Sequence, residues 1–174
     1  MTTQSVAPRA ERPTVPEGYG CPEDDEGMLP WSWAEEQLTR AANYWFATSR
    51  PNGHPHSSPI WAVWMDGKLY FDGSPETRRM KNIAANPHVS VHLESGNEVV
   101  ILEGTASTVA APPDRALTER LAAAYTEKYR EHAYAPTPDQ WDEGGLYVMI
   151  PRLGLGWTLR PGDEFGRSYT RWRF

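Results

Sequence analysis

The chain has 174 residues, enough for one well-buried domain and few for two. Hydrophobic residues make up 39% of it, which predicts a globular protein. The net charge of −6 disfavours nucleic acid and anionic membranes as main partners, because both require a broad basic field.

Residues 1–27 are rich in Pro, Gly and acidic residues and lack apolar periodicity. We therefore expect a flexible arm, laid along a single domain of residues 28–174. Cys21 is the only cysteine, so no disulfide forms within the chain. The sequence has no apolar signal-peptide region and no apolar run of about 18 residues. These features predict a soluble, cytoplasmic protein.

The first expected helix covers residues 33–43. Ser32 and Glu35 have the spacing of a capping box, and apolar residues recur behind them at helical spacing. Asn-Gly and Asp-Gly turns then separate runs rich in strand-forming residues. The sequence therefore predicts a three-stranded antiparallel meander over residues 44–49, 54–65 and 68–71.

The middle strand of this meander contains Pro55 and Pro59. Proline has no N–H to donate to a sheet, so these positions indicate an edge, a bulge or a place where the backbone leaves the sheet. The backbone from Ser57 to Trp61 then has polar groups available to a ligand. An ordinary bulge at a barrel rim is the alternative interpretation.

A short helix is expected to open on Ser74 and Pro75 and to end before Asn86-Pro87. The remaining elements are two strands, a helix, a bent strand and a C-terminal strand, over residues 88–94, 98–109, 114–131, 146–158 and 168–174. This order, with mostly hairpin connections, predicts an antiparallel sheet closed into a barrel with helices at its ends.

The short helix carries an unusual charge distribution. Arg78, Arg79 and Lys81 crowd its first two turns, where the helix dipole repels cations. A bound anion would offset that cost, so these side chains, Ser74, Thr77 and the first backbone N–H groups form a candidate phosphate site. A capped surface helix with a solvated basic face is the alternative.

Motifs of hydrolases, zinc proteases, P-loop proteins and Rossmann folds are missing from the sequence. Two histidine pairs share strand faces, but no Cys or second carboxylate stands at ligand spacing, so we expect no metal site. No pair of acids suggests general acid–base chemistry, and no catalytic residue is assigned. An enzyme without reactive side chains of its own takes its reactive group from a cofactor. The histidine pairs are His54 with His56 and His88 with His92.

Four segments, in this order, resemble the pyridoxamine 5′-phosphate oxidase-like split β-barrel family: YWFATSRPNGHPHSSPIWAVWMDGKLYF, GSPETRRMKNIAANPHVSVHL, VVILEGTA and TRWRF. The resemblance covers about residues 30–174 and is greatest to the actinobacterial branch that uses the deazaflavin coenzyme F420, while other members use FMN. It implies a mainly β fold, a six-stranded antiparallel split β-barrel. It also implies a homodimer with a cofactor in each groove at the subunit interface.

A Ser/Thr-Arg-Lys stretch binds the cofactor phosphate in that family, and Thr77-Arg78-Arg79 stands in its place. Arg79 replaces the common Lys, which keeps the phosphate affinity and changes the geometry. The segment from Ser57 to Trp61 matches the strand whose backbone follows the edge of the flavin or deazaflavin ring. The resemblance thus implies a cofactor site of Ser57, Ser58, Pro59, Ile60, Trp61, Ser74, Thr77, Arg78, Arg79, Lys81 and Asn82, and, in a looser match, Trp157, Arg171 and Trp172 from either subunit.

The function implied by the resemblance is an oxidoreductase in which coenzyme F420 transfers a hydride to a conjugated organic acceptor. An aromatic pocket of Trp61, Trp64 or Trp157 would suit a flat acceptor such as a quinone or a tetrapyrrole-like molecule. The alternatives are an FMN-dependent oxidase or reductase of the pyridoxamine-phosphate-oxidase type, and a non-catalytic protein that binds a flavin, a deazaflavin or a haem-like ligand.

Overall fold

The computed structural model describes residues 7–16 and 18–174. Nine strands pair, all antiparallel, in one sheet that curls into a split barrel. The strands are β1 Arg9–Glu11, β2 Tyr44–Ser49, β3 Pro55–Ile60, β4 Val63–Met65, β5 Lys68–Asp72, β6 His88–His92, β7 Glu98–Thr108, β8 Leu146–Thr158 and β9 Thr170–Arg173. The α-helices are α1 Trp31–Arg40, α2 Arg78–Ala85 and α3 Arg115–Lys128, and two 3₁₀ turns, Arg130–His132 and Pro138–Trp141, follow α3.

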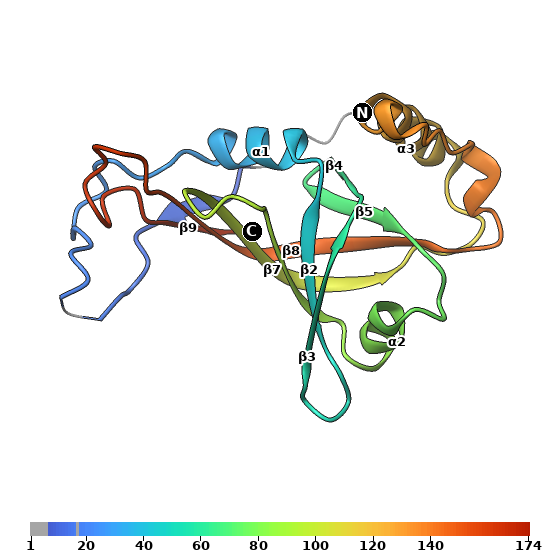
Figure 1. Ribbon diagram of the computed structural model, residues 1–174, viewed down its shortest axis with the longest axis horizontal. Coiled ribbons are helices and arrows are strands. Elements are labelled where there is room, and N and C mark those ends of the chain that lie inside the picture. The colour runs from blue at the N-terminus through green and yellow to red at the C-terminus, as the bar shows by residue number, and fades with distance from the viewer. Residues whose placement is uncertain (1–6, 17) are drawn as a thin grey trace.

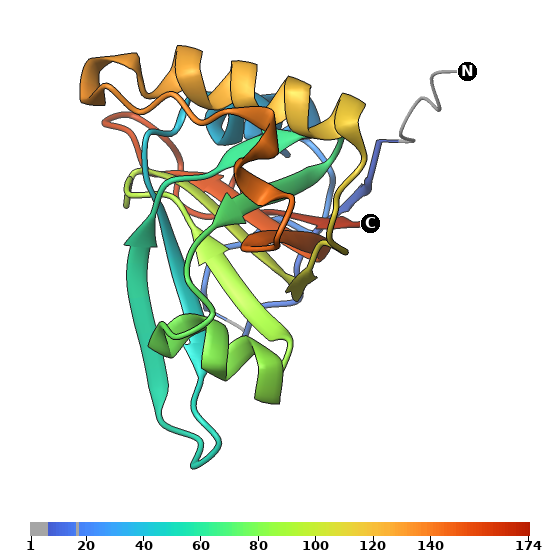
Figure 2. The ribbon, with the colours of Figure 1, turned by 90° about the vertical axis from the view of Figure 1, so that its right-hand side faces the viewer.

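The strand order is β1-β9-β8-β7-β6-β2-β3, and β5 pairs with both β4 and β8. Helices α1 and α3 lie on one side of the sheet and α2 lies on the other (Figures 1 and 2). Apolar side chains fill the barrel between these layers, and a second apolar cluster lies beneath α3. No helix in the described part of the chain has both the length and the apolar character of a membrane span.

The sheet has nine strands, whereas the resemblance implied six and the sequence pattern predicted seven. The two strands beyond the predicted seven arise because one predicted strand divides and the unpredicted β1 extends the sheet edge. The predicted strand 54–65 is interrupted at Trp61-Ala62, so β3 pairs with β2 while β4 pairs with β5. The prediction of a continuous three-stranded meander is therefore wrong. Its interruption has a specific cause, since the Tyr129 hydroxyl accepts from the Ala62 N–H at 2.9 Å and takes the place of a strand neighbour. β3 ends the strand order, a position that suits Pro55 and Pro59.

Other strand predictions are confirmed. β2 has the predicted bounds, and Val89 and Val91 of β6 are buried while His88 and His92 are exposed. The pairing of β7 with β8 shifts register at a bulge between Glu103 and Gly104. A Cβ on Gly104 would lie 2.1 Å from the Ile150 carbonyl oxygen, so the close approach of β8 requires glycine.

The starts of the first two helices differ from the prediction. α1 begins at Trp31 after Pro30, without a side-chain cap, so the proposed capping box is wrong. Ser32 lies inside the first turn, and the Glu35 carboxylate instead accepts a hydrogen bond from Trp64 Nε1 at 3.3 Å. The apolar contacts of the helix set its start, because Trp31 and Trp33 pack against the barrel core.

α2 begins at Arg78 rather than at Ser74-Pro75. Thr77 is the N-cap, and its hydroxyl accepts from the Met80 N–H at 3.5 Å. Ser74 organises the turn before the helix, since its carbonyl accepts from the Thr77 N–H at 3.1 Å. The basic residues therefore stand even closer to the positive end of the helix than the sequence suggested.

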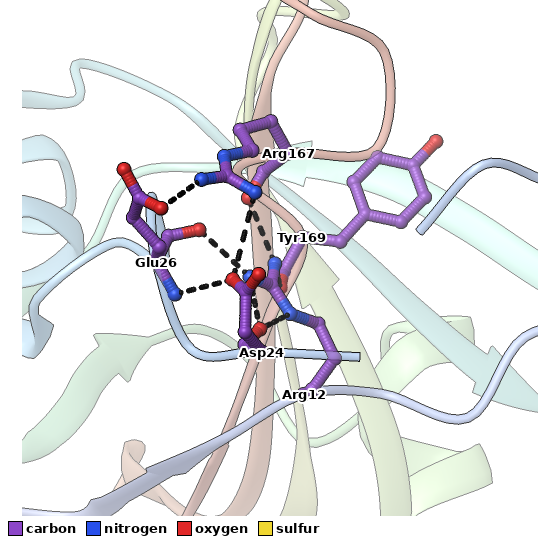
Figure 3. Close-up of polar contacts among 5 residues, drawn as sticks. All are labelled: Arg12, Asp24, Glu26, Arg167 and Tyr169. Carbon is purple, nitrogen blue, oxygen red and sulfur yellow. Dashed lines mark hydrogen bonds and ion pairs between the residues drawn. The ribbon is translucent and has the colours of Figure 1, made fainter. Parts of the chain in front are cut away.

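The described part of the N-terminal arm is attached to the C-terminal strand of the sheet. β1, which the sequence did not predict, pairs with β9. The Arg12 guanidinium donates to the backbone carbonyls of Asp24, Glu26, Arg167 and Tyr169 at 2.7–2.9 Å (Figure 3). Backbone pairing, the ion pairs of Glu11 with Arg171 and Arg173, and the neighbouring Arg12 hold this strand. These contacts require no apolar alternation that a sequence pattern could detect.

Candidate functional site

Arg79 joins α2 to the edge strand β3. Its Nη1 donates to the Ser58 Oγ at 2.9 Å, a contact between residues 21 positions apart. Its Nε is buried and has no hydrogen-bond partner among residues 7–16 and 18–174. Burial lowers the pKa of Arg79 below its usual range, and the negative charge of Asp72 opposes this shift. The guanidinium remains charged and retains hydrogen-bonding capacity for a ligand.

A surface cleft of about 370 Å³ lies beside this contact. It combines a cation, a carboxylate, an indole ring and the exposed end of β3. Such a mixture suits a flat, polar and partly anionic ligand, because each part of the ligand meets a matching group. The lining residues are Asn43, Pro59, Ile60, Trp61, Asp72 and Arg79.

An aromatic cluster supports the Trp61 wall of the cleft. The Trp61 and Tyr129 rings are stacked, with centroids 4.7 Å apart and planes at 17°. His132 and Tyr134 lie against the same indole, at centroid distances of 4.9 and 5.6 Å. The segment that follows α3 therefore fixes the orientation of Trp61. The sequence pattern gave this segment no role in the site, although its aromatic residues were a usable signal.

Asp72, at the end of β5, was also missed as a site residue. Its Oδ2 accepts hydrogen bonds from the Tyr134 hydroxyl at 2.5 Å and from Gln140 Nε2 at 3.2 Å. Burial raises the pKa of Tyr134 to about 12, and the bond to Asp72 adds to this shift. Tyr134 thus stays protonated and keeps the carboxylate in place at physiological pH.

The family model for pyridoxamine 5′-phosphate oxidase matches residues 34–148 of the sequence, which is more than half of the chain. The chain belongs to this family. The match includes β2 to β7, α2 and all the residues that line the cleft. No curated protein matches the sequence.

Solved structures share the fold of this pyridoxamine 5′-phosphate oxidase family member. A conserved hypothetical protein from Mycobacterium tuberculosis has a TM-score of 0.63 and 22% identity, over 78% of this chain and 88% of that one. An FAD-binding protein from Mesorhizobium loti has a TM-score of 0.57 and 17% identity, over 84% and 95%. The heme storage protein HutZ from Vibrio cholerae has a TM-score of 0.54 and 20% identity, over 68% and 87%. At these identities the likeness concerns the fold alone.

The structure brings together one group of the residues that the family resemblance suggested. Ser58, Pro59, Ile60, Trp61 and Arg79 meet at the cleft or beside it. A second group of the suggested residues lies around the start of α2, and their side chains are exposed. One of them, Lys81, forms an ion pair of 2.7 Å with Glu76. The other members of that exposed group are Ser74, Thr77 and Arg78, and Ser57 is exposed on β3.

Asn82 takes a different position, on the inner side of α2. Its side chain is fully buried, and Nδ2 donates to the Thr48 Oγ1 at 2.9 Å. This hydrogen bond ties α2 to β2. In this position Asn82 anchors the helix that carries Arg79, and it does not line the cleft.

The C-terminal candidates Trp157, Arg171 and Trp172 also lie away from the cleft. β9 pairs with the second half of β8, whereas β5, next to the cleft, pairs with the first half. Trp172 is fully buried in the barrel core. Arg171 Nε is 2.6 Å from the Glu11 carboxylate, whose pKa is lowered by Arg173 and Arg171 together. The Trp157 ring packs on Tyr169. Trp64, the other tryptophan suggested for an acceptor pocket, is buried beneath α1, where its Nε1 donates to Glu35.

Lys128 is a partly buried cation next to the Trp61 wall. Its Nζ donates to the Tyr44 hydroxyl at 2.7 Å and to the Ala62 carbonyl at 3.0 Å, and it lies over the Tyr44 ring at 4.7 Å. Burial lowers the pKa of Lys128 to about 8 from its ordinary value of 10.5. The residue links α3 to the point where β3 and β4 separate.

The pKa of Lys128 predicts a pH dependence of stability. Between about pH 8 and pH 10 the unfolded chain binds more protons at this lysine than the folded chain, so the free energy of unfolding rises with pH. We expect a rise of about 1–3 kcal/mol between about pH 7.5 and pH 9.5. Lys128→Met should abolish most of this rise in urea unfolding, while Lys68→Met should keep it. An equal slope in the wild type and in Lys128→Met would contradict the prediction.

Proposed function

We propose that this protein is a cytoplasmic oxidoreductase that binds coenzyme F420 at the Arg79 cleft and transfers a hydride to a conjugated organic acceptor. The observation that carries the proposal is the 2.9 Å hydrogen bond between Arg79 Nη1 and Ser58 Oγ. It places the basic start of α2 beside the strand that a ring would follow. A phosphorylated flavin or deazaflavin needs both parts within the length of one molecule.

The residues present at the cleft fit such a cofactor. Arg79 has a buried Nε without a partner in the described chain, and a phosphate would supply an acceptor for the guanidinium. The first N–H groups of α2 and the exposed Arg78 add positive potential at the same end. The exposed end of β3 and the Trp61 indole offer a backbone edge and an apolar surface to a ring.

Coenzyme F420, when bound and reduced, supplies a hydride to the acceptor. The chain itself contributes binding and orientation. Arg79 and the start of α2 hold the phosphate, β3 sets the position of the ring, and the Trp61 cluster excludes water from one side. A flat conjugated acceptor, such as a quinone, is the substrate class that such a surface suits. We also propose a homodimer in which Trp157 or Arg171 of one subunit reaches the cofactor of the other.

Cofactor titration followed by a reduction assay tests the proposal. We expect added F420 to lose fluorescence at micromolar protein, and reduced F420 to be oxidised when menadione is added with the protein. Binding of FMN alone would support the FMN-dependent alternative and overturn the choice of F420. Binding of F420 without oxidation across a panel of quinones would support a cofactor-binding protein. Binding of neither cofactor would overturn the proposed function, and a monomer in sedimentation would overturn the dimer.

A further inference from the structure

The carboxylate of Asp72 is held in place on one side and open on the other. Tyr134 and Gln140 both donate to the same oxygen, Oδ2, and Gln140 Nε2 also lies 3.2 Å from the Tyr134 hydroxyl. Within the described part of the chain Oδ1 receives no hydrogen bond, and Asp72 lines the cleft. An ionised carboxylate has lone pairs for about four donors, so its capacity is only partly used.

This arrangement is costly for a site that binds only an anion. Asp72 stands close enough to Arg79 for its charge to affect the pKa of that residue, and a negative charge there repels a phosphate. The hydrogen bonds of the two residues go to other partners, since Arg79 Nη1 donates to Ser58 and Asp72 Oδ2 accepts from Tyr134. A ligand with an anionic group and a separate hydrogen-bond donor would satisfy both.

We propose that Asp72, positioned by Tyr134 and Gln140, accepts a hydrogen bond from an N–H or O–H group of the ligand in the Arg79 cleft and thereby determines its specificity. The inference rests on the proposed function. Flavins and deazaflavins share two donors of this kind, the imide N–H of the ring and the hydroxyls of the ribityl chain. Arg79 then recognises the phosphate, and Asp72 recognises the part of the cofactor that carries no charge.

Riboflavin is the probe that isolates the contribution of Asp72, because it has the ring and the ribityl chain without the phosphate. In Asp72→Asn an amide N–H group faces the ligand donor, so the affinity for riboflavin should fall about tenfold or more. FMN should lose less, since the same substitution removes a repulsive charge near the phosphate. Asp66→Asn, which removes a surface partner of Arg120, is the matched control and should leave both affinities unchanged.

Tyr134→Phe provides an independent variant, with Asp72 intact but less well positioned. Riboflavin affinity should fall several-fold, and the ratio of FMN to riboflavin affinity should stay as in the wild type. Lumiflavin, which lacks the ribityl chain, then identifies the donor. An equal loss with lumiflavin in Asp72→Asn assigns the imide, and a loss confined to riboflavin assigns a ribityl hydroxyl.

Two failures are distinguishable. Wild-type protein that binds riboflavin or FMN, with riboflavin affinity unchanged in folded Asp72→Asn or in Tyr134→Phe, overturns the role of Asp72 and leaves the proposed function standing. Wild-type protein that binds neither of these flavins nor coenzyme F420 overturns both. Circular dichroism and the thermal transition of each variant establish that it is folded.

Discussion

Arg79→Ala is expected to weaken the binding of F420 or FMN about 10- to 150-fold while leaving the fold intact. The substitution removes charge-assisted hydrogen bonds to the phosphate, each worth about 1.5–3 kcal/mol. Stability should change little, because burial already works against the charged guanidinium, as its lowered pKa indicates. Fluorescence titration gives the affinity, and urea unfolding gives the stability.

Arg78→Ala is the informative comparison for Arg79→Ala. It removes the same charge from the neighbouring position in the same helical turn, but the Arg78 side chain is exposed. We expect a smaller loss of affinity, which measures the general electrostatic contribution of the helix start. Arg40→Ala, at an exposed ion pair on α1, should have no effect. Equal losses in Arg78→Ala and Arg79→Ala would contradict a specific role for Arg79.

Local patterns predicted the elements of the fold well where one face of a strand or helix is apolar. The alternation of Val89 and Val91 with polar neighbours identified β6, and the Asp66-Gly67 turn identified the hairpin of β4 and β5. In the turn Asp66 and Gly67 both have positive φ, as their types suggest. These signals depend on neighbouring residues, so they are legible in the sequence.

Contacts between distant segments were beyond such patterns. The division of β3 from β4 depends on the Tyr129 hydroxyl, which lies 67 residues away from Ala62. The position of Asp72 at the cleft likewise depends on Tyr134, 62 residues away. Nothing in the local sequence of either strand indicates these partners. The candidate site was therefore predicted on the side of Ser58 and Arg79 and missed on the side of the segment after α3.

The segment after α3 connects stability with the cleft. Lys128 and Tyr129 bind the backbone of Ala62, and Trp61, the preceding residue, is held by Tyr129 and Tyr134. Anything that loosens this segment moves the aromatic wall and the Asp72 carboxylate together. The cleft thus has one side built from local sequence and one side built by long-range packing.

Trp172→Ala is expected to lower the free energy of unfolding by about 3–5 kcal/mol, because it leaves a large cavity in the core. The Trp172 side chain is fully buried and packs edge-on against Trp31, with ring centroids 5.5 Å apart. Gly156 provides the space for it, since a Cβ there would lie 2.5 Å from the Trp172 ring. This packing assigns the residue a structural role in the single chain, whereas the family resemblance placed it near the cofactor.

Trp172→Phe separates these two roles. The indole Nε1 has no hydrogen-bond partner among the described residues, so phenylalanine loses only part of the packing, at a cost of about 1–2 kcal/mol. We expect this variant to bind F420 or FMN with wild-type affinity. A folded Trp172→Phe protein that has lost cofactor affinity would contradict a purely structural role and place the residue at the cofactor of a neighbouring subunit. Urea unfolding and fluorescence titration of the same preparation decide between the two.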